Sequence, residues 1–280
     1  MELYFNIYIL IMIAIATMCK KENPYVNEWV AWHLNIGFDR VYIYDDNDPD
    51  YPYVGDCIDE EYRDKVFIVR YNNVLGDVLT KQALMINQFV ETMHGDIEWC
   101  AFIDGDEFIH IDNYPSVGEW LSHAPEECEC VALNWHIYDD NDIIVGDESA
   151  PVQERFTRCA DDRLRALGVD SYRLAKKIVR LHRDITADDM FYFRRDGVFL
   201  DMYDSQFNNL GECMAAMLPE TTVGQPCYIN HYVTKSASEC LKYKVGALWG
   251  ESTIEDYFFK FNIRTPEKEK YIEEHTPTEE

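Results

Sequence analysis

Apolar residues in the first part of the chain gather in short runs that alternate with longer amphipathic segments. Four of these runs have the length and the β-branched or aromatic composition of strands, namely residues 9–18, 40–44, 65–70 and 98–103. Between them, Tyr25–Ile36 and Asp77–Met93 repeat apolar side chains at helical spacing. Because strands that alternate with helices usually pair in parallel, this part predicts an α/β fold with a mostly parallel sheet flanked by helices.

The first of these runs belongs to a nearly unbroken apolar segment, residues 3–19, which has two interpretations. As a membrane anchor it lacks a preceding basic residue, and its length is at the lower limit for spanning a bilayer. As a strand covered on both faces, it would show the same continuous apolar pattern. Since Asn23 and Pro24, an N-cap followed by a proline, open a helix directly afterwards, we expect Ile9–Met18 to be a central strand. No stable membrane span is then expected, and membrane association through the apolar run is the alternative.

Beyond Asp106 the alternation of strands and helices ends. The predicted elements are strands at 130–138, 175–181 and 227–231, a hairpin turning at Asp196 and Gly197, and helices at 205–218, 236–248 and 253–261. Successive strand-like segments without intervening helices indicate a smaller, antiparallel part of the domain. The residues from Arg264 on are charged and contain proline, so we expect a loose acidic tail over 264–280.

The charge and cysteine content exclude some classes of function. Fifty-two acidic residues against 25 basic ones give a net charge of −27, which disfavours binding to nucleic acid and to anionic lipid. The nine cysteines form no C-x-x-C pair, and the chain contains no Asn-x-Ser/Thr sequon. Reduced thiols in a cytoplasmic protein are the simplest interpretation.

Two carboxylates follow the apolar strand at 98–103 directly. Asp104 and Asp106, separated by a glycine, can point toward one place outside the carboxyl end of that strand, where open α/β sheets bind their ligands. Oxygen ligands of this kind suit Mn²⁺ or Mg²⁺. Glu22 and Asp45 follow two other predicted strands and belong to the same edge. For each of these acidic residues, an ordinary polar turn is the alternative interpretation.

Four segments resemble motifs of glycosyltransferases with the GT-A fold, most closely the family 92-like and related family 2-like enzymes. Residues 20–33 resemble the family opening K-N-E-G-P-Y-x-x-E-W-V-A-Y-H, with Lys21 and Asn23 in place of its asparagine and glycine. Phe102–Phe108 resembles F-x-D-x-D-E-F, the segment 176–180 resembles K-x-I-V-R, and Asn230–Ser236 resembles N-H-Y-x-x-K-S. The resemblance covers residues 13 to 250, with its motifs in the family's order.

This resemblance implies a nucleotide-diphospho-sugar donor, usually uridine-based, and a divalent metal. It places Asp106 on the metal with Asp104 nearby, and His231 matches a C-terminal histidine that completes the metal shell in many GT-A enzymes. Lys235 is a candidate for contact with the diphosphate, because so acidic a protein needs a cation there. Their positions at strand ends make Glu22, Asp45 and Asp104 candidates for nucleotide-sugar binding. A structural histidine and a solvated lysine are the alternatives for His231 and Lys235.

Inverting transfer also needs a carboxylate that accepts the proton of the attacking hydroxyl. The first candidate is Asp204, because it is predicted to begin the helix that precedes the strand ending at His231. The alternatives are Asp139, Asp140 and Asp142, which follow the strand at 130–138.

Together these patterns predict one GT-A domain over residues 1–263, with a nucleotide-binding half at about 9–110 and an acceptor-side half at about 111–263. The expected function is metal-dependent, inverting transfer of a sugar from a UDP-sugar to a glycan or glycoconjugate acceptor. The donor sugar is a hexose such as galactose or a pentose such as xylose. Two alternatives remain: a catalytically weak protein that binds nucleotide-sugar or glycan, and a metal-dependent nucleotidyltransferase.

Overall fold

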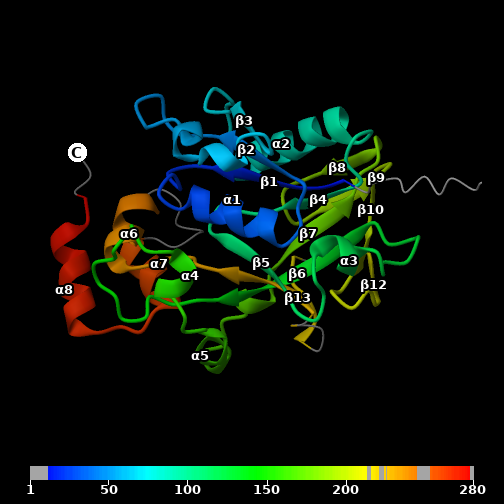
Figure 1. Cartoon of the computed structure of the whole chain (residues 1–280). Helices are drawn as coiled ribbons and strands as arrows, with labels where there is room; N and C mark the ends of the chain where they lie inside the picture. Colours follow the sequence, from blue (N-terminus) through cyan, green and yellow to red (C-terminus); the bar gives the residue numbers. More distant parts are fainter. Residues whose placement is uncertain (1–11, 213–215, 221–223, 225, 245–252, 278–280) are drawn as a thin grey trace, which may run out of the picture.

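A computed structural model describes residues 12–212, 216–220, 224, 226–244 and 253–277 (Figure 1). Its main feature is a ten-stranded sheet whose central part is parallel, with strand order β4-β1-β2-β3. The bounds of these strands are β1 (Ile13–Cys19), β2 (Arg40–Asp45), β3 (Val66–Arg70) and β4 (Trp99–Phe102). The α/β class predicted from the sequence is therefore confirmed, and the architecture is consistent with GT-A.

The rest of the sheet is mixed. β7 (Ala175–Arg180) runs antiparallel to both β4 and β6 (Cys130–Ile137), and β11 (Asp201–Tyr203) with β12 (Asn209–Glu212) continue this side of the sheet. β13 (Cys227–His231) joins β6 to β5 (Glu107–Ile111) as a branch. A separate antiparallel sheet contains β8 (Ile185–Ala187), β9 (Phe193–Arg195) and β10 (Val198–Phe199). The smaller antiparallel part that the sequence predicted is thus present.

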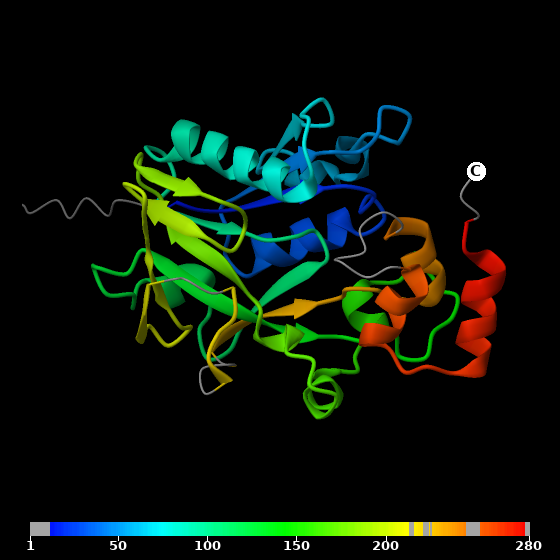
Figure 2. The ribbon, with the colours of Figure 1, turned by 180° about the vertical axis from the view of Figure 1, so that it is seen from behind.

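Helices cover both faces of the parallel strands (Figures 1 and 2). Alternate residues of β1 belong to different apolar cores: Ile13 and Ile15 pack in the core that contains α1 (Val26–Asn35), and Ala14 and Ala16 pack in the core that contains α2 (Val78–Met93). Burial on both faces explains why this strand is continuously apolar. The prediction of a central strand is confirmed for the described residues, and residues 9–11 lie outside them. Among the described helices, none combines the length and the apolar composition that crossing a membrane requires.

The remaining helical segments are short. They are α3 (Val117–Leu121), α4 (Val152–Arg155), α5 (Asp161–Ala166), α6 (Ala237–Tyr243), α7 (Ile254–Phe261), α8 (Pro266–His275) and the 3₁₀ turns Val54–Cys57, Glu60–Tyr62 and Ser171–Arg173. α6, α7 and α8 gather at one end of the molecule, and β8, β9 and β10 lie at the other (Figures 1 and 2). Ser236 and Thr253 cap α6 and α7, which begin where helices were predicted, whereas the predicted extension of α6 to residue 248 falls outside the described residues.

The predicted helix at 205–218 is wrong. The chain turns after Asp204 and returns as β12, because the Asp204 carboxylate accepts hydrogen bonds from the backbone N–H groups of Gln206 and Asn208. Phe207 in this turn has a φ of 64°, which a helix does not allow. Side-chain oxygens of aspartate that bind nearby backbone N–H groups compete with helix formation, and here the turn prevails.

Two further expectations are also wrong. Asn23 does not cap α1, since Tyr25 is the N-cap residue and the Asn23 amide donates to the carbonyl oxygen of Pro52. The tail expected to be loose forms α8, which Thr265 caps and on which Ile272 is 1% exposed. By contrast, the hairpin between β9 and β10 has Asp196 and Gly197 at its turn, both with positive φ, as predicted.

Candidate functional site

The segment that links β4 to β5 carries Asp104 and Asp106. It begins at the carboxyl end of β4, next to the carboxyl end of β1 in the parallel sheet, and Glu22 follows β1. A Cβ atom on Gly105 would lie 3.4 Å from Cγ of Glu22, so the link packs directly against the Glu22 side chain. The structure therefore places these three carboxylates at one edge of the sheet, as the sequence predicted.

Asp106 faces His231, the last residue of β13. Nε2 of His231 lies 3.4 Å from Oδ1 of Asp106, and the two residues are 6% and 4% exposed. The ring of Trp135 packs against the imidazole with 4.3 Å between centroids, which restrains its orientation. Nδ1 of His231 is buried and has no hydrogen-bond partner among the described residues.

Asp104 is held by different partners. Its Oδ2 lies 2.8 Å from Nζ of Lys176 on β7, and its Oδ1 accepts a hydrogen bond of 3.3 Å from Gln82 on α2. Lys176 has no exposed surface and also lies 3.8 Å from Oε1 of Glu107. The two aspartates of the link are therefore directed to different cations, and Asp104 is oriented by β7 and α2.

A pair of lysines surrounds Glu22. Nζ of Lys235 lies 3.2 Å from Oε2 of Glu22, and the Lys235 backbone has a φ of 56°. Nζ of Lys244, at the C-cap of α6, lies 3.1 Å from Oε1 of Glu22 and 2.5 Å from Oδ2 of Asp106. Glu22 is thus shared by two cations, and Lys244 joins it to Asp106.

Burial and charge shift several pKa values in this cluster. Burial opposes ionisation of Asp106, but the charges of Lys244 and His231 outweigh it and hold the Asp106 pKa well below its usual range. Burial raises the pKa of Glu107 well above its usual range, and Lys176 offsets this only in part. Burial lowers the pKa of Lys244, but Asp106 and Glu22 outweigh that effect and raise it well above the ordinary value. Asp106 and Lys244 are therefore an ionised pair near neutral pH.

Asp45 ends β2, two strands from β4 at the same edge. Its carboxylate is completely buried: Oδ2 lies 2.9 Å from Nη1 of Arg70, and Oδ1 accepts a hydrogen bond from the backbone N–H of Asn47. The edge position is confirmed, and a nucleotide contact by Asp45 stays a prediction.

The candidates for the catalytic base are all engaged in the free protein. Asp204 lies after β11, which is three strands from β4, and it binds its own turn, so the reason for preferring it, a helix start, is wrong. Asp139 is paired with Arg158, and Asp140 and Asp142 contact Lys268. The base assignment stays a prediction for all four.

The donor atoms of Asp106 and His231 suit a divalent metal. They present a carboxylate oxygen and an imidazole nitrogen 3.4 Å apart, a combination that binds Mn²⁺. The third predicted ligand, Asp104, has both carboxylate oxygens committed to Lys176 and Gln82. The structure thus brings together two of the three predicted ligands, and metal binding itself stays a prediction.

A second group of ligand-type side chains lies outside this cluster. His136, Cys159 and Asp161 have ligand atoms within 4.8 Å of one another among the described residues. Both oxygens of Asp161 are already used, since Oδ2 lies 2.6 Å from Nδ1 of His136 and Oδ1 accepts from the backbone N–H of Ile137. These hydrogen bonds connect α5 to β6, which gives the cluster a structural role.

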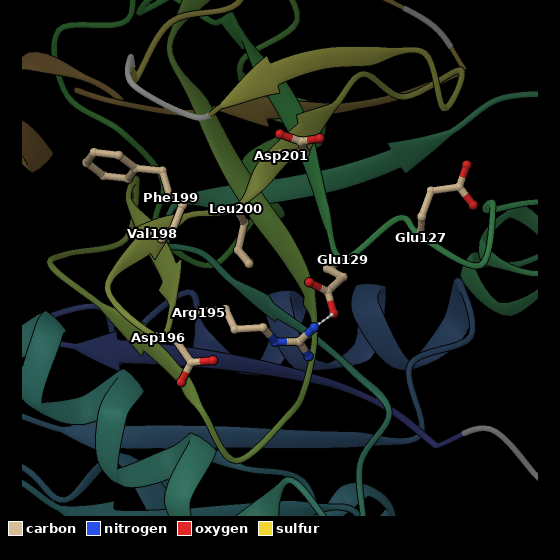
Figure 3. A pocket seen from close by; sticks show the side chains of 8 residues that line it. All are labelled: Glu127, Glu129, Arg195, Asp196, Val198, Phe199, Leu200 and Asp201. Atoms are coloured by element: carbon tan, nitrogen blue, oxygen red, sulfur yellow. Dashed lines mark ion pairs between the residues drawn. The ribbon is translucent and has the colours of Figure 1, made fainter.

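A surface pocket of about 390 Å³ lies at the β9–β10 end of the molecule, away from α6 (Figure 3). Arg195 and Glu129 form an ion pair of 2.5 Å in its wall. The residues predicted to form the site are all described, and none of them lines this pocket. Its lining is Glu127, Glu129, Arg195, Asp196, Val198, Phe199, Leu200 and Asp201.

Three residues of the cluster received no role from the sequence. Lys176 was detectable in principle, because a lysine inside the strand-like segment 175–181 must either be exposed or find an anion. Nothing in the sequence indicated that Glu107, which follows the two aspartates, would be buried. Lys244 gave no signal, since it is one of several lysines in a helical segment and meets Asp106 only through the tertiary fold.

No protein-family model matches the chain. Over 97 residues, which are 35% of the chain, it is 33% identical to a glycosyltransferase family 92 protein of Ricinus communis. Over 98 residues, which are 34% of the chain, it is 30% identical to a glycosyltransferase family 92 protein of Oryza sativa subsp. japonica. The chain is thus similar to family 92 glycosyltransferases over about a third of its length. The matches cover only 17% and 16% of these two relatives, so their names support a glycosyltransferase here without transferring the activity of the whole proteins.

Proposed function

We propose that this chain is a metal-dependent, inverting glycosyltransferase that moves a sugar from a UDP-sugar to a glycan acceptor. The observation that carries the proposal is the pairing of Asp106 with His231 at the carboxyl edge of the parallel strands, beside the buried Lys235 and the partly buried Lys244. Similarity to family 92 glycosyltransferases supports it independently. A protein with a net charge of −27 needs such a local cluster of cations to accept a diphosphate.

In this proposal Asp106 and His231 hold the metal, which when bound neutralises charge on the departing diphosphate. Trp135 keeps the His231 ring in its orientation. Lys235 donates a hydrogen bond to a phosphate oxygen, and its left-handed backbone conformation directs its side chain toward Glu22 at the sheet edge. Asp104, fixed by Lys176 and Gln82, faces the sugar side.

Proton removal from the acceptor needs a carboxylate that is free when the acceptor is bound. Asp139, Asp140, Asp142 and Asp204 each have a hydrogen-bonded or ionic partner in the free protein. Asp142 is the most exposed of the three in the loop after β6, with half of its side chain accessible, so its partners are the easiest for an acceptor to displace.

The test is release of UDP from a panel of UDP-sugars with and without Mn²⁺. We expect release that requires the metal and falls at least 100-fold in Asp106→Asn, because one metal ligand loses its charge. Asp162→Asn, in which an exposed aspartate on α5 loses the same charge, is the matched control and should retain wild-type release. Metal-independent release, or an equal loss in both variants, would contradict the proposal.

The same assay separates the two alternatives. A binding protein without turnover would bind a UDP-sugar in the presence of Mn²⁺ but release no UDP. A nucleotidyltransferase would release UMP or pyrophosphate in place of UDP. Chromatography of the nucleotide products therefore distinguishes all three.

A further inference from the structure

Lys244 contacts Asp106, the carboxylate that the proposed function assigns to a metal. Its ammonium group lies 2.5 Å from Oδ2 of Asp106, whose other oxygen faces His231 at 3.4 Å. The Lys244 side chain is 16% exposed and that of Asp106 is 6% exposed. Water therefore screens this ion pair poorly, and any cation that approaches Asp106 meets the positive charge of Lys244.

Four groups of the cluster balance one another in charge before any ligand binds. Two carboxylates, Asp106 and Glu22, face two ammonium groups, Lys235 and Lys244. A divalent metal alone would add two positive charges to this enclosed, neutral group. A diphosphate arriving with the metal would restore the balance. The two ligands should consequently favour each other's binding, and such coupling is reciprocal.

Lys244 also has an alternative partner. Its ammonium group lies 3.1 Å from Oε1 of Glu22 as well as 2.5 Å from Asp106. It can therefore leave Asp106 without becoming an unpaired buried charge, which would be costly. Asp106, in turn, keeps His231 when Lys244 moves.

We propose that Lys244 competes with divalent metal for Asp106, so that the free protein takes up metal weakly and a bound diphosphate releases this restraint. The proposal rests on the proposed function for the identity of the diphosphate. The competition between Lys244 and the metal can be measured without any nucleotide.

The test measures Mn²⁺ affinity by electron paramagnetic resonance of the free ion, with and without UDP, at constant pH and ionic strength. Wild type is compared with Lys244→Met and with Lys242→Met. Lys242 is the matched control, because it lies on the same helix and loses the same charge, but it pairs with Glu148 and its side chain is 57% exposed. Thermal melting of each variant reports whether the fold is retained.

We expect UDP to tighten Mn²⁺ binding to wild type by about tenfold or more, which is a usual size for coupling between sites. Lys244→Met should bind Mn²⁺ alone about tenfold more tightly than wild type, with a smaller effect of UDP. Lys242→Met should behave as wild type. If Lys244→Met unfolds, Lys244→Gln, which retains a hydrogen-bond donor, should show the same direction.

The proposal fails if a folded Lys244 variant binds Mn²⁺ alone no more tightly than wild type, because Lys244 is then only a structural ion-pair partner. A different pattern separates the proposed function from this inference. If a Lys244 variant tightens Mn²⁺ binding but UDP changes nothing in wild type, the competition stands, whereas the coupling and the nucleotide-dependent function are contradicted.

Discussion

Nζ of Lys268 lies 2.6 Å from Oδ2 of Asp140, and both side chains are almost completely buried. The ammonium group also donates to Oδ1 of Asp142 and to the carbonyl oxygen of Ile263. The buried lysine of α8 therefore holds the loop after β6, in which Asn141 and Asp142 both have positive φ. Two of the candidate carboxylates of this loop, Asp140 and Asp142, are therefore held in part by α8.

Lys268→Met should destabilise the protein by about 3 kcal/mol or more, because it leaves the buried Asp140 carboxylate without its closest cation. Urea unfolding at pH 7 measures the loss. Lys270→Met on the same helix is the control, since Lys270 is 73% exposed and only pairs with Glu274. That variant should change the free energy of unfolding by less than about 0.5 kcal/mol. Equal effects of the two substitutions would show that α8 does not hold the loop.

The pKa of Glu239 predicts how the stability of the folded protein depends on pH. Burial opposes ionisation of its carboxyl group, but hydrogen bonds from Arg155, Ser236 and Tyr25 outweigh burial and lower its pKa below the ordinary 4.5. The folded protein thus binds this proton less readily than the unfolded chain. The resulting stabilisation is complete above pH 4.5 and is lost as the pH falls through the lowered pKa of the folded state.

Glu239→Gln should therefore make the free energy of unfolding depend less on pH between about pH 4.5 and 3 than in wild type. At pH 7 the variant should be less stable by about 3 kcal/mol, because Arg155, whose side chain is 7% exposed, loses its buried carboxylate partner. Urea unfolding over this pH range checks both effects. Glu255→Gln, which removes an exposed partner of Arg264, should follow the wild-type curve. A Glu239→Gln curve parallel to wild type would contradict the assignment.

Gly146 allows this same carboxylate to approach the backbone. A Cβ atom at position 146 would lie 2.1 Å from Oε2 of Glu239 and 2.8 Å from Oγ of Ser236. Since Arg155 and Ser236 hold the Glu239 side chain, it cannot move aside easily. Gly146→Ala should cost about 2 kcal/mol, in the range of other overpacking substitutions.

Gly95→Ala provides the matched control for this substitution. A Cβ atom there would have no neighbour within 4 Å, so the variant should unfold at nearly the wild-type temperature. Differential scanning calorimetry of both variants makes the comparison. A melting temperature for Gly146→Ala equal to that of Gly95→Ala would mean that Glu239 is free to move.

The elements around the candidate site were predictable where their signals are local. β1 is continuously apolar because both of its faces are buried, and α2 shows helical spacing because one of its faces is buried. Both elements were predicted. Asp106 and His231 were placed at one edge through motif resemblance and the direction of parallel strands. Local pattern failed at Asp204, because a helix and a turn compete there for the same backbone N–H groups.

Periodicity and neighbouring residues were enough to predict the alternation of strands and helices from β1 to β4 and the residue types available at the sheet edge. Which cation meets which carboxylate depends instead on the folded arrangement of the chain. Lys244 and Asp106 are 138 residues apart, and Lys268 and Asp142 are 126 apart. Nothing in the local sequence distinguishes these lysines from exposed ones. Their pairing follows from packing, because a buried charge is stable only where the fold supplies its partner.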